Sequence, residues 1–289
     1  MVTKKWFNKK ISSFLENDPS NKMDGLDGQL IFDPEVLVGF CSGQDPIFDE
    51  YKKRVGPFHL TPKEAFDKFC RLNDLQTEGN RDITVVAYIL PINQITKKEN
   101  YEYSKEWPSE RWAHTRLYGE KANQKLQKYL LNELKREFGV LGVAPMTEKK
   151  LFKIHRKHKD AYQGVWASTW SHRHICFAAG LGSFGLSDGF LNEKGKAMRC
   201  GSIVINHKLA SDANKRPSDP YEYCTNCGDC IERCPVSAIS YEGGHDKQKC
   251  SEKVMATIPY IKKNYQINIY ACGLCQVEVS CSNAIPLKK

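Results

Sequence analysis

Residues 224–235 read Cys-Thr-Asn-Cys-Gly-Asp-Cys-Ile-Glu-Arg-Cys-Pro, which is the spacing C-x2-C-x2-C-x3-C-P. In this spacing, three thiolates wrap one [4Fe–4S] cubane, and the fourth cysteine ligates the other cluster of a pair. Zinc sites also use cysteines two residues apart, but four close cysteines ending in Cys-Pro are not typical of them. The motif therefore predicts two iron–sulfur clusters in this part of the chain.

The rest of the chain supplies the ligands that the second half of such a module needs. Eight cysteines are required for two cubanes, and the chain places four more of them after the motif. The pairing logic of the motif assigns one cluster to Cys224, Cys227, Cys230 and Cys281, and the other to Cys234, Cys250, Cys272 and Cys275. We predict a ferredoxin-like double-cluster domain over residues 211–289, entered through a linker over 208–223 that is rich in Asp, Pro, Ser and Lys.

The other cysteines, the hydropathy and the net charge limit the possible location and partners of the protein. Four cysteines stand apart from any partner and are predicted to be small buried hydrophobic residues: Cys41, Cys70, Cys176 and Cys200. No run of 18 apolar residues occurs, and the basic N-terminus lacks both an apolar export segment and a twin-arginine pair, so we expect a cytoplasmic protein without membrane contact. The formal net charge of +9 falls to about +5 with two anionic cubanes bound. This excess suits an acidic partner, a polyanionic substrate or simply a soluble surface.

The first 210 residues show strands alternating with helices. Helices are expected over 4–16, 61–72 and 115–137, and another is expected from Ser171 to the glycines after Ala179. Strands are expected over 82–90, 140–144 and 201–206, whereas 37–41 reads as a strand or a turn. An aromatic, charged connection should separate the strand ending near Pro91 from the helix after His114. The pattern predicts an α/β or α+β domain over residues 1–210.

The order of parts around residues 171–206 carries a family resemblance. A basic helix start, Ser171-His-Arg-His, leads into Ala179-Gly-Leu-Gly-Ser-Phe-Gly, and a strand and the double-cluster module follow. This order resembles the cobalamin-dependent epoxyqueuosine reductases and reductive dehalogenases over about residues 82–286. The resemblance implies a nitroreductase-like domain that holds a base-off corrinoid between itself and the clusters, which pass electrons to the cobalt.

The same segment supplies the candidate corrinoid contacts. Gly180, Gly182 and Gly185, with Leu181 between them, would let the backbone approach a flat ligand closely, or would only cap the helix and turn the chain. Polar donors at the helix start would bind an anionic or amide edge of the cofactor, or the histidines would be ordinary surface or core residues. These donors are Ser171, His172, Arg173 and His174.

The chain departs from the family in ways that leave the substrate open. Epoxyqueuosine reductases carry an aspartate, the presumed proton donor, upstream of the glycine-rich helix, where residues 165–170 here hold no carboxylate. The tRNA-contacting helical region that often follows the clusters is not expected, since the sequence stops at Lys289. Cys281 precedes Ser282 instead of the usual proline.

The function that these observations favour is an enzyme, a corrinoid-dependent reductase that cleaves a C–O, C–halogen or related bond. A low-potential ferredoxin or flavodoxin would donate the electrons, and the substrate would be a small molecule or linked to tRNA. Candidate proton donors are Tyr118, His114, Tyr103 and His172. Two alternatives stay open: an electron carrier or reactivase without corrinoid, and a nucleic-acid-binding protein, suggested by basic and aromatic residues over 97–116.

Overall fold

The computed structural model describes residues 1–23, 25–76, 82–155 and 166–287. Its α-helices are α1 (Lys4–Asn17), α2 (Ile47–Arg54), α3 (Pro62–Leu72), α4 (Gln94–Tyr103), α5 (Glu110–Phe138), α6 (His172–Ala178), α7 (Asp229–Glu232) and α8 (Lys247–Tyr265). Its strands are β1 (Leu37–Ser42), β2 (Thr84–Pro91), β3 (Gly142–Val143), β4 (Ile154–His155), β5 (Ala167–Ser168), β6 (Ser183–Phe184), β7 (Phe190–Leu191), β8 (Met198–Ile205), β9 (Ile239–Ser240) and β10 (Gly244–His245).

Helix ends follow the capping residues of the sequence. In α3 the Glu64 N–H donates to Thr61 Oγ1 at 3.2 Å, and the Thr61 N–H donates to Glu64 Oε2 at 2.9 Å. This reciprocal pair satisfies two backbone donors that the helix itself leaves free. The long helix α5 is capped by Ser109 and ends at Gly139, whose φ of 67° is left-handed. Such a residue commonly closes a helix because glycine pays no side-chain penalty there.

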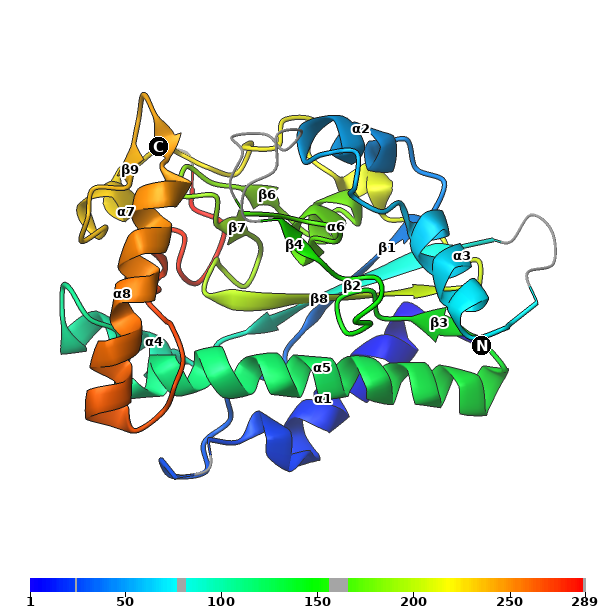
Figure 1. Cartoon of the computed structure of the whole chain (residues 1–289), viewed down its shortest axis with the longest axis horizontal. Helices are drawn as coiled ribbons and strands as arrows, with labels where there is room; N and C mark the ends of the chain where they lie inside the picture. The colour runs from blue at the N-terminus through cyan, green and yellow to red at the C-terminus, as the bar shows by residue number, and fades with distance from the viewer. Residues whose placement is uncertain (24, 77–81, 156–165, 288–289) are drawn as a thin grey trace.

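An antiparallel four-stranded sheet forms the centre of the molecule, in the order β1-β2-β8-β3 (Figure 1). Each of its pairings is antiparallel, with Val86 opposite Phe40 on one side and Ile203 on the other. Strand β2 is buried along its whole length, as its continuous apolar sequence requires. Strand β3 pairs only with Val204 and Ile205, so the rest of this edge of β8 has no partner strand among the described residues.

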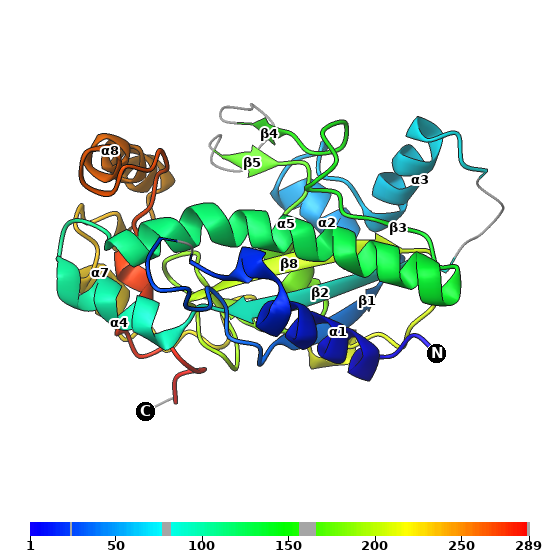
Figure 2. The ribbon, with the colours of Figure 1, turned by 90° about the horizontal axis from the view of Figure 1, so that it is seen from below.

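Helices cover both faces of the sheet. On one face α1 and α5 pack against each other and against the sheet (Figure 2), and Phe7, Leu126 and Tyr88 belong to the apolar core between them. On the other face, α2, α3 and α6 contribute to a second core that includes Phe66, Val85 and Ile175. The isolated cysteines are buried as predicted, in this second core: Cys41, Cys70, Cys176 and Cys200.

The cysteine-rich part of the chain lies at one end of the sheet, at the left of Figures 1 and 2, where α7 and β9 lie near α8 and β9 pairs with β10. Helix α8 contacts the first turns of α5, and the Tyr265 hydroxyl donates to the Pro108 carbonyl at 2.9 Å. No helix among the described residues is long and apolar enough to cross a membrane.

The mixed α/β architecture that the sequence predicted is confirmed, with differences in detail. Helix α4 was missed: residues 94–103 were expected as part of a connection, but Asn93 caps a helix there by accepting from the Ile95 N–H at 2.8 Å. Helix α5 starts five residues earlier than expected, since Ser109 accepts from the Trp112 N–H and nucleates it. The division of the chain at residue 210 stays a prediction.

Candidate functional site

The motif of residues 224–235 forms a loop that contains the short helix α7. Gly228 precedes it with a φ of 90°, in the left-handed region that favours glycine. Backbone N–H groups donate to two of the sulfurs: Leu186 to Cys224 Sγ at 3.4 Å, and Ala238 to Cys234 Sγ at 3.2 Å. Hydrogen bonds of this kind favour the thiolates that iron–sulfur clusters need and tune the potential of a bound cluster.

The structure brings one predicted set of four cysteines together around a pocket, whose lining includes Cys224, Cys227, Cys230 and Cys281. Burial raises the pKa of Cys281 to about 11, and the neighbouring sulfurs of the set contribute to the rise. In the part of the chain that the structure describes, no group of three or more His, Cys, Asp or Glu side chains is arranged to hold a single metal ion. A pocket lined by four thiols fits a four-iron core better than a single zinc ion, which draws its ligands to one point.

The second predicted set also comes together, although its members are spread over more than forty residues. Burial raises the pKa of Cys250 to about 11, and Cys272 and Cys234 raise it further by their proximity. Burial likewise raises the pKa of Cys275 to about 12, with contributions from Cys272, Cys250 and Cys230. Because Cys230 belongs to the first set, the two sets are neighbours. This donor set fits a second cubane.

The glycine-rich segment that follows α6 packs against the protein's own chain. A Cβ at Gly180 would lie 2.6 Å from the Asp212 carbonyl oxygen. A Cβ at Gly182 would overlap the Leu191 carbonyl oxygen, and a Cβ at Gly185 would lie 2.7 Å from Leu191 Cδ1. The Leu181 side chain lies against Gly39 of β1. Internal packing therefore accounts for these glycines, and their contact with a corrinoid stays a prediction.

The polar residues at the start of α6 point to different neighbours. Arg173 Nη1 donates to the Asp188 carbonyl oxygen at 2.5 Å, and Asp188 also pairs with His245 at 3.2 Å. The Ser171 hydroxyl and His174 Nδ1 lie 2.8 Å apart. Burial lowers the pKa of His174 to about 3, and His59 and Arg173 lower it further. The charge of Asp188 raises the pKa of Cys250 and that of Arg173 lowers it, so the start of α6 borders the second cysteine set.

His172 lies in a polar chain that reaches around the free edge of β8. His172 Nδ1 is 2.7 Å from Ser202 Oγ, which accepts from Trp170 Nε1 at 3.0 Å. On its other side, His172 Nε2 lies 3.3 Å from Gln127 Nε2 on α5. Burial lowers the pKa of His172 to about 4, so the imidazole is neutral near pH 7. The chain thus joins α5, β8 and α6 where β3 does not reach.

Two buried polar atoms near this edge have no hydrogen-bond partner among the described residues, Gln127 Oε1 and Arg199 Nε. The Arg199 guanidinium does bind the Glu120 carboxylate at 2.6 Å through Nη1. Burial lowers the pKa of Arg199, whose charged neighbours include Glu120 and Arg116. Arg116 in turn donates to the Tyr270 hydroxyl at 2.6 Å, two residues before Cys272. The edge of β8 is therefore polar, incompletely satisfied and adjacent to the second cysteine set.

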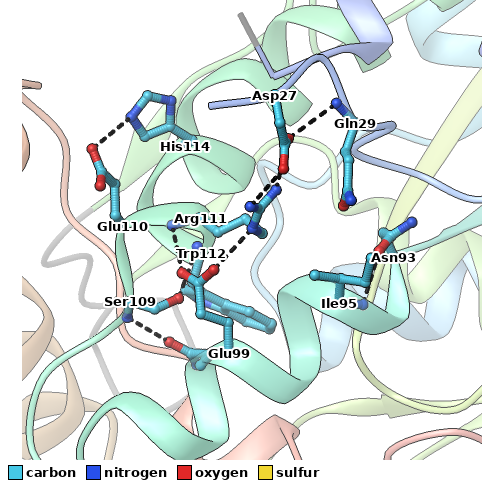
Figure 3. Close-up of polar contacts among 11 residues, drawn as sticks. Asp27, Gln29, Asn93, Ile95, Glu99, Ser109, Glu110, Arg111, Trp112 and His114 are labelled. Atoms are coloured by element: carbon cyan, nitrogen blue, oxygen red, sulfur yellow. Dashed lines mark hydrogen bonds and ion pairs between the residues drawn. The ribbon is translucent and has the colours of Figure 1, made fainter. Parts of the chain in front are cut away.

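The other three candidate proton donors lie on α4 and α5. The ring centroids of His114 and Tyr118 are 5.4 Å apart, and Figure 3 shows His114 facing Glu110, at 3.8 Å, at the start of α5. Burial lowers the pKa of His114. Tyr103 is separate, because its hydroxyl lies 2.5 Å from that of Tyr260 on α8. Among the four candidates, His172 is the one whose side chain contacts β8, through Ser202, in the part of the chain that the structure describes.

Sequence reasoning missed several residues of this region. Gln127, Arg199 and Ser202 have no motif around them and are brought together only by the packing of α5, β8 and α6. Lys196 was also missed, although it is buried and lines the pocket of the first cysteine set. No local pattern distinguishes it from the exposed lysines that surround it in the sequence.

Comparison with known proteins identifies the cysteine-rich segment directly. Residues 220–240 match the family model described as a 4Fe-4S binding domain. The chain is 30% identical to an epoxyqueuosine reductase of Staphylococcus aureus over 112 residues, which are 37% of this chain and 28% of that protein. It is 31% identical over 110 residues to an epoxyqueuosine reductase of Lactococcus garvieae, covering 36% of this chain and 29% of that protein. The matches thus span less than a third of these relatives.

A solved structure shows a related fold over nearly the whole chain. A catabolic reductive dehalogenase, in complex with 3-bromo-4-hydroxybenzoic acid, superposes with a TM-score of 0.50 and 15% identity, covering 96% of this chain and 36% of the dehalogenase. Identity at this level shows a shared fold alone. The predicted resemblance is confirmed: this chain is similar in sequence to the epoxyqueuosine reductases and in fold to a reductive dehalogenase, and its residues 220–240 match a 4Fe-4S binding domain.

Proposed function

We propose that this chain is a corrinoid-dependent iron–sulfur reductase that cleaves a carbon–oxygen or carbon–halogen bond. The observation that carries the proposal is the polar free edge of β8, where Gln127 Oε1 and Arg199 Nε are buried without partners among the described residues. Arg116, a charged neighbour of Arg199, binds the Tyr270 hydroxyl two residues before Cys272 and so links this edge to the second cysteine set. Buried polar groups are almost always satisfied in native proteins, so Gln127 Oε1 and Arg199 Nε at this polar edge are the groups that a bound ligand would satisfy.

A corrinoid fits this edge by the chemistry of its periphery, which carries amide side chains. Separate amides of that periphery would donate to Gln127 Oε1 and accept from Arg199 Nε. Ser171 and Arg173, at the start of α6, are further candidates to hold the cofactor. When bound, the clusters would supply single electrons and the corrinoid cobalt would deliver reducing equivalents to the substrate bond.

The residues of the polar chain would supply a proton to the substrate. Reduction of an epoxide to an alkene takes two electrons and two protons and releases water. With its proton on Nδ1, His172 would donate to Ser202 Oγ, and its Nε2 would accept from Gln127 Nε2. We rank His172 first among the four candidate donors because it alone contacts the polar edge of β8.

The name of the curated relatives favours an epoxide as the substrate class, either free or linked to tRNA. A low-potential ferredoxin or flavodoxin would supply the electrons one at a time. These assignments rest on the resemblance, and they hold only if the protein binds a corrinoid.

The test is an anaerobic titration of the iron-loaded protein with hydroxocobalamin, read in the visible spectrum. Gln127→Leu removes one proposed contact and should weaken cobalamin binding about tenfold, the value of one hydrogen bond. Asn132→Leu, at an exposed position of the same helix, should bind as wild type. Iron content should be equal in the three proteins. Wild type that holds about eight irons but binds no cobalamin would overturn the proposal in favour of an electron carrier.

A further inference from the structure

Lys196 is a buried cation beside the cysteines. Its exposed fraction is only 3%, and it lines the same pocket as Cys224, Cys227, Cys230 and Cys281. Lysine is rarely buried unless an opposite charge compensates it, because removing an ammonium group from water is costly. Its position therefore calls for a negative partner close by.

Both ends of this residue are held in place. The Lys196 backbone N–H donates to the Cys281 carbonyl at 2.9 Å, and its Nζ donates to Ser187 Oγ at 2.9 Å. The preceding Gly195 has a φ of 80° and approaches the Ser282 carbonyl so closely that a Cβ would overlap it. The ammonium group is thus fixed by the segments that flank the first cysteine set.

Among the described residues, no carboxylate forms an ion pair with this ammonium, and Asp229, which lines the same pocket, accepts from the Ser280 N–H at 2.7 Å. Ion pairs are formed by two other lysines near the site, Lys194 with Glu35 at 2.6 Å and Lys253 with Glu106 at 3.5 Å, but none involves Lys196 among the residues that the structure describes. The ammonium lowers the pKa of thiols in both sets, Cys230 and Cys281 in the first and Cys275 in the second. It therefore lies within electrostatic reach of both.

We infer that Lys196 is a positioning residue whose fixed positive charge compensates the two clusters and raises their reduction potentials. Each [4Fe–4S] cubane with four thiolates is anionic and becomes more so on reduction. A cation held nearby in a medium of low dielectric constant stabilises the reduced state more than the oxidised state. The effect should be larger for the cluster whose pocket Lys196 lines. This inference rests on the assignment of the cysteine sets to clusters and is independent of the corrinoid.

The test is a redox titration of the iron-loaded full-length protein followed by electron paramagnetic resonance. Lys196→Met keeps the length and removes the charge. We expect the reduction equilibrium constant of the first cluster to fall about tenfold, a shift of about 59 mV to more negative potential for one electron, and that of the second cluster to fall less. The matched control is Lys194→Met, which removes a lysine paired at the surface two residues away and should leave both potentials unchanged.

A second pair of variants guards against failed assembly. Lys196→Gln removes the charge but keeps a donor for Ser187, and should reproduce the shift with the iron content of wild type. Lys196→Arg keeps the charge and should keep the wild-type potentials. The inference is overturned if Lys196→Gln retains its iron and both potentials match wild type, because packing alone would then explain the buried lysine. It is also overturned if Lys194→Met shifts the potentials as much as Lys196→Met.

Discussion

Gly182 shows how a single hydrogen atom decides the packing around the first cysteine set. Its α-carbon lies so close to the Leu191 carbonyl that a methyl group would overlap the oxygen, whereas at Gly185 a methyl group would meet only the end of the Leu191 side chain at 2.7 Å. A backbone carbonyl in a strand has no room to move, but a leucine side chain changes rotamer. The two glycines are therefore unequal in what they tolerate.

We predict that Gly182→Ala lowers the free energy of unfolding by at least about 2 kcal/mol, as overpacking against fixed atoms does. Gly185→Ala should cost less than about 1 kcal/mol, since only a flexible side-chain end must shift. Urea unfolding of both variants at equal iron content measures the difference. Equal costs would show that the Leu191 strand yields more easily than its contacts indicate.

His59 is fully buried, and neither of its ring nitrogens has a hydrogen-bond partner among the described residues. Burial lowers its pKa from 6.5 to about 4, and Lys52 lowers it further. A histidine with a depressed pKa contributes stability that is complete above its unfolded pKa and is lost as the pH falls toward the folded value. The loss should therefore set in below about pH 6.5 and be complete near pH 4.

We predict that His59→Phe keeps or raises the free energy of unfolding at about pH 7.5. At about pH 5.5, where wild type has lost stability by protonation of the unfolded chain, the variant should avoid about 1 kcal/mol of that loss. The reason is that phenylalanine has no nitrogen to desolvate and no proton to bind. Urea midpoints of both proteins at the two pH values provide the measurement. His207→Gln, at a less buried histidine, serves as the control and should leave the pH profile as it is. A His59→Phe protein that loses stability equally at both pH values would contradict the argument.

At the scale of elements, the start of α5 is held by one arginine. Figure 3 shows Arg111 reaching two carboxylates from different segments, Asp27 at 3.0 Å and Glu99 of α4 at 2.9 Å. The guanidinium fork suits this geometry because it presents donors in two directions at once. Arg111 thereby joins α5, α4 and the segment that follows α1.

We predict that Arg111→Ala lowers the free energy of unfolding by about 1–2 kcal/mol, since both partners are partly exposed and water screens the pairs. Arg111→Lys keeps the charge but not the fork and should recover less than half of the loss. Thermal unfolding at low and high salt checks both values. A loss that does not shrink as salt is added would mean that packing, and not charge, is the cause.

The elements differ in how well local sequence predicts them. Helix α3 was predicted within a residue because its start, Thr61-Pro-Lys-Glu, contains the whole cap. Helix α4 was missed because its residues lack a clear apolar periodicity, and its aromatic side chains contact α8, far along the chain, as Tyr103 contacts Tyr260. Propensity predicts an element only where the local signal is strong, because tertiary contacts decide the others.

At the scale of the molecule, the two cysteine sets give a test of the cluster assignment. We predict about eight irons per chain in anaerobically prepared wild type and about four after Cys227→Ser or Cys275→Ser, because each removes a ligand of one cluster. Cys176→Ala, in the second apolar core, should keep the full iron content. Iron analysis and paramagnetic resonance provide the readout. Loss of iron from Cys176→Ala at unchanged stability would show that the ligand sets are wrong.

Local sequence was enough to predict the cluster chemistry, the buried strand β2 and the capped helix α3, because each of these depends on residues close together in the chain. The predicted ligand sets of the two clusters follow from thiol chemistry and cysteine spacing, and their assignment stays a prediction. The polar chain from Gln127 through His172 to Ser202 and the burial of Lys196 had no such signal. These residues meet across 30 positions or more, or lie against cysteines up to 85 residues away. Only the packing of α5, β8 and the cysteine loops brings them together, since burial and neighbours, and not residue type, decide what an ordinary glutamine or lysine does.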